Sequence, residues 1–360
     1  MPKTSKNQRR ILVVRNDKVG DLIIATPALK ALRESFPDAF ISAWVSIYAK
    51  DVLSNNPYVD KVIVEDENGK HKGLRGLLLL VEEIKKERFD TAVVIFPFFR
   101  NALAVFLARI PIRISTGFRW YQFLFNRLTY LRRSKALRHE IDYAVELVEM
   151  AGAKPIKGLP ELYPSKDDYN YAEDFFSKNG IRKDNNIIIG INPGSGLSAR
   201  KWPEKCYIEL SKRLIEKIGA DIIIFWGPGE KAMAEEMARA IGKGSVIASE
   251  TNILQLAAFI SNCSLFITNN TGPMHIAAAT DTPMIAIFDP KKACAPERWG
   301  YEDEKRIVLK PNIDCNDSCR KKRCGYDECM ELVTVDMVFK SAQKLLGSEI
   351  LNQRKEGENA

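Results

Sequence analysis

The chain has 360 residues, 46% of them hydrophobic, which is enough to bury a large core and at this length more often forms two domains than one. The basic N-terminal stretch is followed only by the short apolar run Ile11–Val14, and apolar runs such as Leu77–Val81 are too short to span a bilayer. With a modest net charge of +8, these features argue against an exported or membrane-spanning chain and predict a soluble, cytoplasmic, globular protein.

Short buried strands and amphipathic helices alternate in the first half of the chain. Alternation of this kind is typical of a parallel sheet with crossover helices. The expected strands are Ile11–Val14, Phe40–Val45, Val62–Val64 and Thr91–Phe96, and the expected helices include Ala28–Phe36 and Leu74–Arg88.

The loop after the first strand offers a candidate general base. Asp21 follows Gly20 near the start of a helix, at the carboxyl edge of the predicted sheet, where a carboxylate could accept a proton from an acceptor hydroxyl. The alternative is that Asp21 caps the helix or interacts with its dipole, and Asp17 is a nearby competitor for the catalytic role.

The segment from Thr91 to His139 contains no Asp or Glu but is rich in basic and aromatic residues. Such a segment suits an anionic partner, either a phosphorylated glycolipid or a membrane surface, whereas no nucleic-acid-binding module accompanies it. The alternative is a set of core aromatics with solvated arginines. The aromatic residues are Phe96, Phe98, Phe99, Phe106, Phe118, Trp120, Tyr121, Phe123, Phe125 and Tyr130.

Residues 152–169 carry three prolines and no clear periodicity, which indicates a linker. Strand and helix signals then resume, so we predict an α/β protein with two Rossmann-like domains, residues 1–165 and 166–335, followed by a C-terminal helix and tail at 336–360. The resumed elements are strands at 186–191, 221–226, 265–268 and 283–288 and helices at about 204–217 and 230–241.

Three glycine-containing turns follow apolar strands in the second half, at Asn192–Gly196, Gly227–Glu230 and Asn270–Pro273. Parallel strands place such turns at one edge, where glycine lets the main chain approach a ligand and a helix N-terminus suits a phosphate. Lys201 could add a point charge for a phosphate oxygen, the alternative being a solvated surface lysine. A dinucleotide site is disfavoured, because no acidic residue follows the strand at 221–226 to bind a ribose.

The cysteines and carboxylates do not indicate a catalytic metal. Cys315, Cys319, Cys324 and Cys329 are close enough to hold zinc but include no C-x2-C pair, and the cluster could equally be a basic loop that contacts an anion or solvent. No Asp-x-Asp stands at a strand end to hold Mg²⁺, so we expect neither a metal nor a cofactor.

Four segments in this order and spacing resemble glycosyltransferase family 9, the ADP-heptose:lipopolysaccharide heptosyltransferases. They are RNDKVGDLIIATPALKALRESFP, NPGSGLSARKWPEKCYIELSKRL, WGPGE and ITNNTGPMHIAAATDTPMIAIFDP, and the resemblance extends from Ile11 to about Leu346. It implies a GT-B fold whose two parallel sheets face each other across a cleft, with the acceptor bound by the N-terminal domain and the nucleotide sugar by the C-terminal one. It also implies hinge closure about residues 152–169.

The activity that the resemblance implies is inverting, metal-independent transfer of a heptose from ADP-L-glycero-D-manno-heptose to the Kdo/heptose inner core of lipopolysaccharide. The expected location is the inner face of the cytoplasmic membrane, with peripheral attachment. The alternatives are a family member with another nucleotide-sugar donor, or a non-catalytic nucleotide-binding module associated with the membrane.

By position in these motifs, Asp21 matches the catalytic base, Lys201 a phosphate-binding lysine, and Glu230 an acidic residue near the nucleotide or sugar. Asn270 departs from the best-known heptosyltransferases, which carry Asp there, and this leaves the donor sugar open. The full set of predicted donor-binding residues is Asn192, Gly194, Ser195, Gly196, Lys201, Gly227, Glu230, Asn270, Thr271, Gly272, Pro273, Met274 and His275. Arg100, Arg119 and Trp120 are predicted to contact the acceptor.

Overall fold

The computed structural model describes residues 8–130, 133–181, 187–195, 199–313, 315 and 328–357, with side chains described up to residue 347 except at residue 134. The chain divides into two compact units, Met1–Tyr163 and Pro164–Ala360. This division falls two residues before the domain boundary expected from the sequence. Among the described residues, no helix is both long enough and apolar enough to cross a lipid bilayer.

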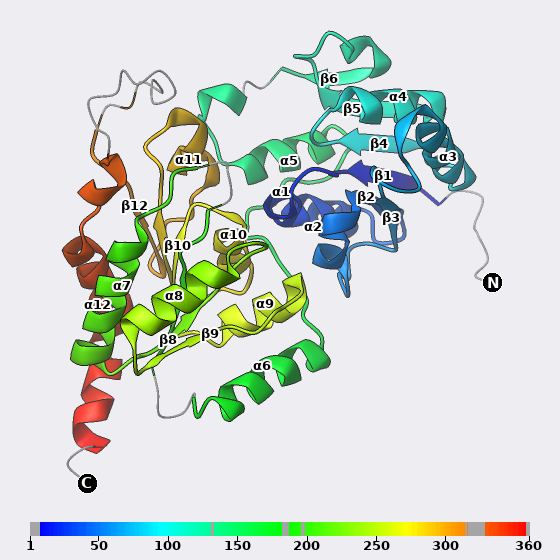
Figure 1. Ribbon diagram of the computed structural model, residues 1–360. Coiled ribbons are helices and arrows are strands. Elements are labelled where there is room, and N and C mark those ends of the chain that lie inside the picture. Colours follow the sequence, from blue (N-terminus) through cyan, green and yellow to red (C-terminus); the bar gives the residue numbers. More distant parts are fainter. Residues whose placement is uncertain are drawn as a thin grey trace. The chain divides into compact units, whose positions relative to one another are not determined.

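The first unit is built on a six-stranded parallel sheet in the order β3-β2-β1-β4-β5-β6 (Figure 1). The strands are β1 Arg10–Val14, β2 Phe40–Ser46, β3 Lys61–Glu65, β4 Thr91–Val94, β5 Ile112–Thr116 and β6 Arg127–Thr129. The helices are α1 Val19–Ile24, α2 Thr26–Ser35, α3 Gly73–Lys86, α4 Phe99–Leu107 and α5 Glu140–Glu149, with shorter 3-10 turns η1 Ile47–Leu53, η2 Gln122–Leu124 and η3 Arg133–Lys135.

Alternation of side chains along β1 explains the two helix layers of this unit. Leu12 and Val14 face one side of the sheet, where they pack in a core with Leu80 of α3 and Val105 of α4. The intervening residues Ile11 and Val13 are equally buried and point to the other side, because successive side chains of a strand alternate. On that side α2 packs against α5.

The second unit repeats the plan with the strand order β12-β11-β10-β7-β8-β9. The strands are β7 Ile188–Asn192, β8 Asp221–Ile224, β9 Ser245–Ile247, β10 Leu265–Asn269, β11 Met284–Ile287 and β12 Arg306–Leu309. The helices are α6 Lys166–Lys178, α7 Glu204–Ile218, α8 Lys231–Ile241, α9 Ile253–Ser261, α10 Gly272–Ala279, α11 Pro296–Trp299 and α12 Val335–Gly357, with turns η4 Lys292–Cys294 and η6 Cys329–Leu332.

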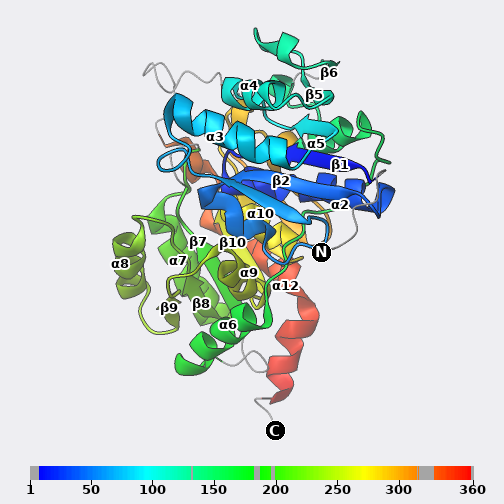
Figure 2. The same cartoon turned by 90° about the vertical axis from the view of Figure 1, so that its right-hand side faces the viewer.

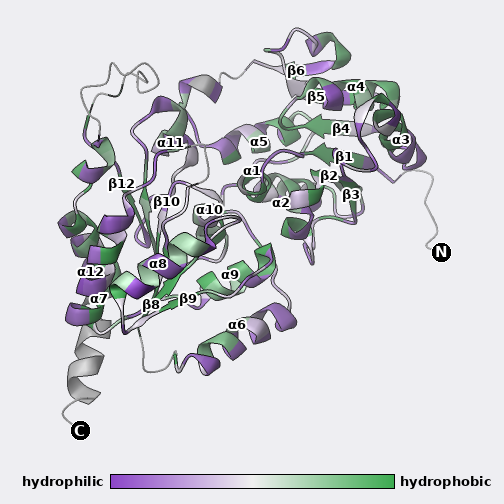
Figure 3. Cartoon of the chain, viewed as in Figure 1, coloured by the Kyte–Doolittle hydropathy of each residue, from purple (hydrophilic) through white to green (hydrophobic). Residues whose placement is uncertain are grey.

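Helices form two layers in the second unit as well. Helix α6 lies beside α9 (Figure 2), while α7 packs between α8 and α12. The central strands are apolar along most of their length, as Figure 3 shows, which is the composition of parallel strands covered on both faces. Two six-stranded parallel sheets covered by helices confirm the predicted pair of Rossmann-like α/β units.

The segment predicted as a linker is more ordered than its composition suggested. Helix α6 begins inside it at Lys166, because Ser165 and Asp168 form a reciprocal capping box in which the Ser165 hydroxyl accepts from the Asp168 amide and the Asp168 carboxylate accepts from the Ser165 amide. The preceding stretch is attached to the first unit, since the Glu161 amide donates to the Thr26 hydroxyl at 2.9 Å. The Asn55 side chain likewise donates to the carbonyl of Tyr163 at 3.1 Å.

Candidate functional site

A buried arginine gathers three carboxylates at the carboxyl end of β1. Arg15, directly after the strand, donates from Nη2 to Asp21 Oδ1 at 2.7 Å, and its Nε lies 2.9 Å from Asp17 Oδ1. Its Nη1 lies 3.7 Å from the buried carboxylate of Glu140 at the start of α5. The Asp21 carboxylate makes no capping bond in α1, and the guanidinium therefore orients it instead of the helix backbone.

Asp17, in the loop between β1 and α1, has a strongly raised pKa. Burial raises the pKa of Asp17 from its ordinary value of 3.8 to about 6; the Arg15 guanidinium opposes this rise and the neighbouring Asp21 adds to it. Burial also lowers the pKa of Arg15, but the surrounding carboxylates outweigh burial and the net shift is upward, so the guanidinium stays charged. Asp17 thus changes its charge near neutral pH beside the candidate base.

The wild-type protein is expected to lose folding stability as the pH rises through the pKa of Asp17, and replacement of Asp17 by Asn should remove this loss. Because the folded-state pKa of Asp17 is raised, the folded protein binds its proton more tightly than the unfolded chain does, and this contribution to stability is full below about pH 4 and lost as the pH rises through about 6. The loss amounts to at most about 3 kcal/mol for a shift of about two units.

Urea unfolding of the wild type and Asp17→Asn at several pH values between about 4 and 7 measures this contribution. We expect the wild type to lose stability relative to the variant as the pH rises. A stability difference that does not change across this range would contradict the raised pKa.

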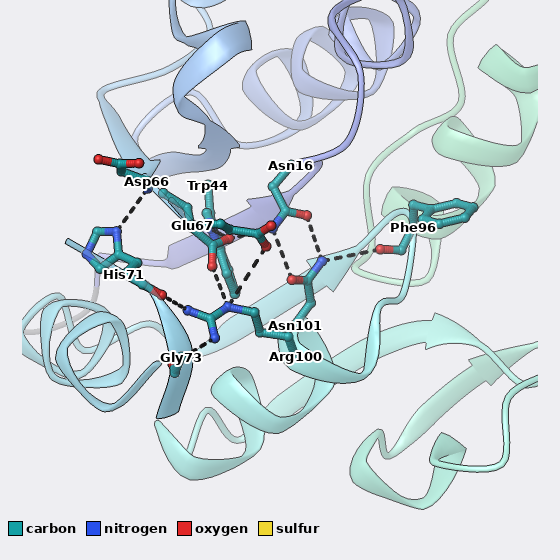
Figure 4. A network of polar contacts seen from close by, with 10 residues as sticks. Asn16, Trp44, Asp66, Glu67, His71, Gly73, Phe96, Arg100 and Asn101 are labelled. Carbon is teal, nitrogen blue, oxygen red and sulfur yellow. Dashed lines mark hydrogen bonds and ion pairs between the residues drawn. The ribbon is translucent and has the colours of Figure 1, made fainter. Parts of the chain in front are cut away.

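A second polar network holds the residue between Arg15 and Asp17 (Figure 4). The Asn16 side chain donates to Glu65 at 2.6 Å and exchanges two hydrogen bonds with Asn101 of α4, at 3.0 and 2.7 Å. Glu65, at the end of β3, is buried and also accepts from Trp44 Nε1 at 2.9 Å. Side chains from β2, β3 and α4 therefore hold the loop between β1 and the helix α1 that carries Asp21, and this loop is restrained before any ligand binds.

The three predicted acceptor residues occupy different environments. Arg100 donates from Nε to Glu65 at 2.7 Å, and its remaining nitrogens donate to the carbonyls of His71 and Gly73, so it has a structural role in the network of Figure 4. Arg119 is exposed, and its guanidinium lies 6.0 Å from the centre of the Phe96 ring.

That same ring is 5.7 Å from the guanidinium of Arg15, so Arg119 lies on the side of the unit that carries the carboxylates. Trp120 is 74% exposed and stacks on Phe99 at 5.2 Å. Arg119 and Trp120 remain predicted acceptor contacts with accessible side chains, whereas the polar atoms of Arg100 already have partners within the protein.

In the second unit, the three predicted turns follow three adjacent strands. Strand β7 pairs with β10 on one side and β8 on the other, with Asn192 level with Thr268 and Ile191 level with Ile224. The turns after these strands therefore lie at one sheet edge, as the sequence predicted. Asn192 is buried and its amide is directed to the Gly194 carbonyl at 3.4 Å, which makes it part of the turn's framework.

Glu230 packs against the glycine turns that follow β7 and β8. Its carboxylate accepts from the Gly227 amide at 2.9 Å and lies directly over Gly194, where an added Cβ would overlap it. The turns after β7 and β8 are joined in this way by one carboxylate. Glu230 is half-buried, so this negative charge borders the space above the sheet edge.

Lys201 is directed outward because the residue after it is firmly anchored. Trp202 is fully buried; its indole donates to the Val333 carbonyl at 2.7 Å, and its amide donates to Asn269 Oδ1 at 2.8 Å. The Lys201 side chain is 44% exposed and pairs with Glu204, the first residue of α7. A diphosphate would compete with this exposed carboxylate for the ammonium group.

A cavity of about 670 Å³ opens beside these residues within the second unit. Its volume is typical of a site for a small organic ligand. Three predicted donor residues, Ser195, Lys201 and Glu230, line it. The remaining lining residues are Ala199, Arg200, Pro203, Glu328, Cys329, Met330 and Glu331.

In the turn before α10 a ligand could reach the main chain, but fewer polar groups than predicted are without a partner in the protein. Thr271 occupies the N-cap position, yet its hydroxyl makes no capping bond and donates to the Asn269 carbonyl at 3.3 Å. A Cβ on Gly272 would meet no neighbour within 4 Å, so a ligand could approach the backbone closely there. The Met274 amide, by contrast, already donates to the Thr271 carbonyl at 3.0 Å.

Two other predicted donor residues of this turn make contacts within the protein. The His275 side chain is buried and its Nδ1 lies 3.0 Å from the Tyr301 hydroxyl. Asn270 donates to the Cys294 carbonyl at 3.2 Å. Predicted donor residue Gly196 lies outside the described residues, as do Cys319 and Cys324 of the cysteine cluster; Cys329 is buried, with its Sγ 3.1 Å from Arg200 Nη1.

Two residues that organise this edge were not predicted from the sequence. Asn269 is fully buried and donates to the carbonyls of Pro193 and Gly194 at 2.9 and 3.2 Å while accepting from the Trp202 amide. Asp289, after β11, is buried and accepts from the Arg200 amide at 2.7 Å. A polar residue directly at the end of an apolar strand was the available signal for both.

Comparison with known proteins assigns the family. The model of glycosyltransferase family 9 (heptosyltransferase) matches residues 77–329, which is well over half of the chain. The chain belongs to glycosyltransferase family 9. The fold of two Rossmann-like units is accordingly a GT-B fold, and the first unit's carboxylates and the second unit's cavity belong to a family 9 glycosyltransferase.

Two relatives show how far the likeness extends in sequence. A putative glycosyltransferase of Haemophilus influenzae is 28% identical over 81% of this chain and 85% of its own length. The lipopolysaccharide heptosyltransferase 2 of Salmonella typhimurium is 25% identical over 94% of this chain and 99% of its own.

Two solved structures have the same fold as this family 9 member. The family 9 glycosyl transferase of Veillonella parvula is 24% identical with a TM-score of 0.86, and the ADP-heptose heptosyltransferase II of Escherichia coli is 23% identical with a TM-score of 0.75. Each comparison covers 96% of this chain and 99% of the other.

Proposed function

We propose that this transferase moves a heptose from ADP-L-glycero-D-manno-heptose to the Kdo/heptose inner core of lipopolysaccharide. The observation that carries the proposal is the match to the heptosyltransferase family model, together with relatives named lipopolysaccharide heptosyltransferase 2. The first unit, with its accessible Arg119 and Trp120, is assigned to the acceptor, and the second unit, with its cavity, to the ADP-sugar.

Asp21 is assigned the role of general base. As the acceptor oxygen bonds to the anomeric carbon and the bond from that carbon to the diphosphate oxygen breaks, the hydroxyl proton passes to the Asp21 carboxylate. The hydrogen bond from Arg15 at 2.7 Å keeps this carboxylate oriented. A single displacement of this kind inverts the anomeric configuration, since no covalent sugar–enzyme intermediate is formed.

The departing ADP gains negative charge, and groups of the second unit are assigned to stabilise it. Lys201 supplies an ammonium group at the mouth of the cavity, and the open backbone at Gly272 supplies amide dipole at the start of α10. The proposed reaction uses these groups without a metal ion. Glu230 is assigned to hydroxyl groups of the nucleotide or sugar, because a carboxylate can accept hydrogen bonds from them.

The donor assignment predicts selective stabilisation by ADP. Thermal unfolding in the presence of ADP, UDP, GDP and CMP should show the largest rise in midpoint with ADP, and at a ligand concentration about 100 times the dissociation constant the added stability is about 2.7 kcal/mol. Mass spectrometry of the product from ADP-heptose and Kdo-lipid A then tests transfer directly. Selective stabilisation by another nucleotide would point to another donor sugar, whereas ADP binding without transfer would point to a non-catalytic module.

A further inference from the structure

Exposed large apolar side chains are concentrated on the first unit. Of the 17 such side chains found among the described residues, 13 belong to the first unit and four to the second. Nine of the 13 come from the acid-free segment between Thr91 and His139. These nine are Phe98, Phe99, Phe106, Leu107, Phe118, Trp120, Phe123, Tyr130 and Leu137.

The segment from Thr91 to His139 was interpreted either as a surface for an anionic partner or as core aromatics with solvated arginines. The exposure of its aromatic side chains favours the surface. Seven of its ten aromatic side chains are exposed, whereas Tyr121 and Phe125 are buried and Phe96 is half-buried. A segment that used its aromatics to build the core would show the opposite distribution. The exposed rings also contact one another, since Phe99 stacks on Trp120 at 5.2 Å and Phe118 meets Tyr130 edge-on at 5.7 Å.

Helix α3 extends the same surface. Leu74 and Leu78 are one helical turn apart and are 71% and 50% exposed, so they form an apolar stripe facing solvent. Arg100 of α4 donates to the Gly73 carbonyl at 3.2 Å, which places the start of α3 beside the start of α4. Helices α3 and α4 lie together in Figure 1. We call Leu74, Leu78 and the nine residues above the apolar face.

Charge identifies the kind of partner that fits the apolar face. Arg109, Arg119, Arg127 and Lys135 are exposed in the same segment, which contains no acidic residue. A second copy of this face would bring like charges together. An anionic bilayer instead offers hydrocarbon to the phenylalanines and leucines, a headgroup layer to Trp120 and Tyr130, and phosphates to the arginines.

We propose that the apolar face seats the first unit on an anionic lipid bilayer, with Trp120 at the level of the headgroups. The side chains enter the interface without spanning the membrane, as interfacial apolar faces do. The proposal rests on the proposed function only in that a glycolipid acceptor would be presented at this surface. The binding itself requires no substrate and is tested without one.

Vesicle binding by the full-length protein provides the test. We expect the protein to sediment with vesicles of phosphatidylglycerol and phosphatidylcholine, to bind pure phosphatidylcholine at least about tenfold more weakly, and to bind less at about 1 M than at about 0.1 M salt. The tryptophan emission should shift to shorter wavelength on binding, and Trp120→Phe should abolish most of the shift, because Trp120 is the most exposed tryptophan.

Variants of exposed residues outside the proposed catalytic and acceptor groups separate docking from transfer. Phe106→Ser combined with Phe123→Ser should weaken binding to anionic vesicles at least about tenfold while the thermal midpoint stays near that of the wild type. Met337→Ser, at a 40%-exposed apolar position in α12 of the second unit, is the matched control and should bind as the wild type does.

Absence of vesicle binding, or equal binding to neutral and anionic vesicles, would overturn the proposal. Concentration-dependent self-association that the double substitution abolishes would assign the face to a second copy. Transfer to a detergent-dispersed acceptor should be unchanged in the double variant. If vesicle binding fails while that transfer persists, the docking surface is wrong and the proposed function stands. If the protein binds vesicles but turns over no ADP-sugar, the docking surface stands and the proposed function is wrong.

Discussion

Replacing Asp21 with Asn is expected to lower kcat by about 10²- to 10⁴-fold, the usual contribution of a general base. Asn preserves the shape of the side chain and can still accept the 2.7 Å hydrogen bond from Arg15, so the loop should keep its conformation. Only the proton-accepting charge is lost. The affinity for ADP should remain at the wild-type value, because the groups assigned to the donor belong to the second unit.

Steady-state transfer kinetics and calorimetric titration with ADP measure the two quantities separately. Asp17→Asn is the matched control, since Asp17 pairs with Nε of the same guanidinium whose Nη2 pairs with Asp21. It should retain far more turnover than Asp21→Asn. If the control loses activity and Asp21→Asn does not, the base is Asp17; if neither loses it, the carboxylate mechanism is wrong.

Replacing Asn269 with Ala is expected to destabilise the second unit by about 2–4 kcal/mol and to weaken ADP binding. The substitution leaves the amide of Trp202 and the carbonyl of Pro193 without the Asn269 side chain, and the Gly194 carbonyl keeps only its longer bond from Asn192. The loop that carries Lys201 and the turn that carries Ser195 are both held by this side chain. Loss of stability and loss of donor affinity should therefore appear together.

Urea unfolding and ADP titration check this expectation, with the adjacent Asn270→Ala as control. Asn270 makes one side-chain bond, at 3.2 Å, and is half-buried, so its removal should cost under about 1 kcal/mol. Equal effects of the two substitutions would show that Asn269 does not have the organising role assigned to it. A destabilised Asn269→Ala protein with unchanged ADP affinity would separate the donor site from this edge.

The fold was predictable because its signals are local. Apolar runs such as Ile11–Val14 and Leu265–Thr268 alternate with amphipathic helices, and that alternation predicts parallel α/β units without knowledge of any long-range contact. Helix α6 was not predicted, because the prolines of residues 152–169 suggested a linker, whereas the capping box of Ser165 and Asp168 begins a helix there.

Side-chain roles were less predictable, because neighbouring residues in the sequence have different partners in space. Asn269 and Asn270 read alike in the sequence, yet one is fully buried with three backbone partners and the other contacts a single carbonyl. Arg100 and Arg119 both belong to the basic segment, but Arg100 pairs with Glu65, 35 residues before it in the sequence, whereas Arg119 is exposed.

The sequence by itself therefore determined the two Rossmann-like units and the carboxyl edge of the second sheet, where the glycine turns meet. It also determined that Asp21 lies near the carboxyl edge of the first sheet. Periodicity and strand order in parallel sheets are enough for those conclusions. Only the tertiary structure decided which polar groups already have partners within the protein and which aromatic rings reach solvent. Burial and hydrogen bonding depend on residues far apart in the chain, and composition cannot report on them.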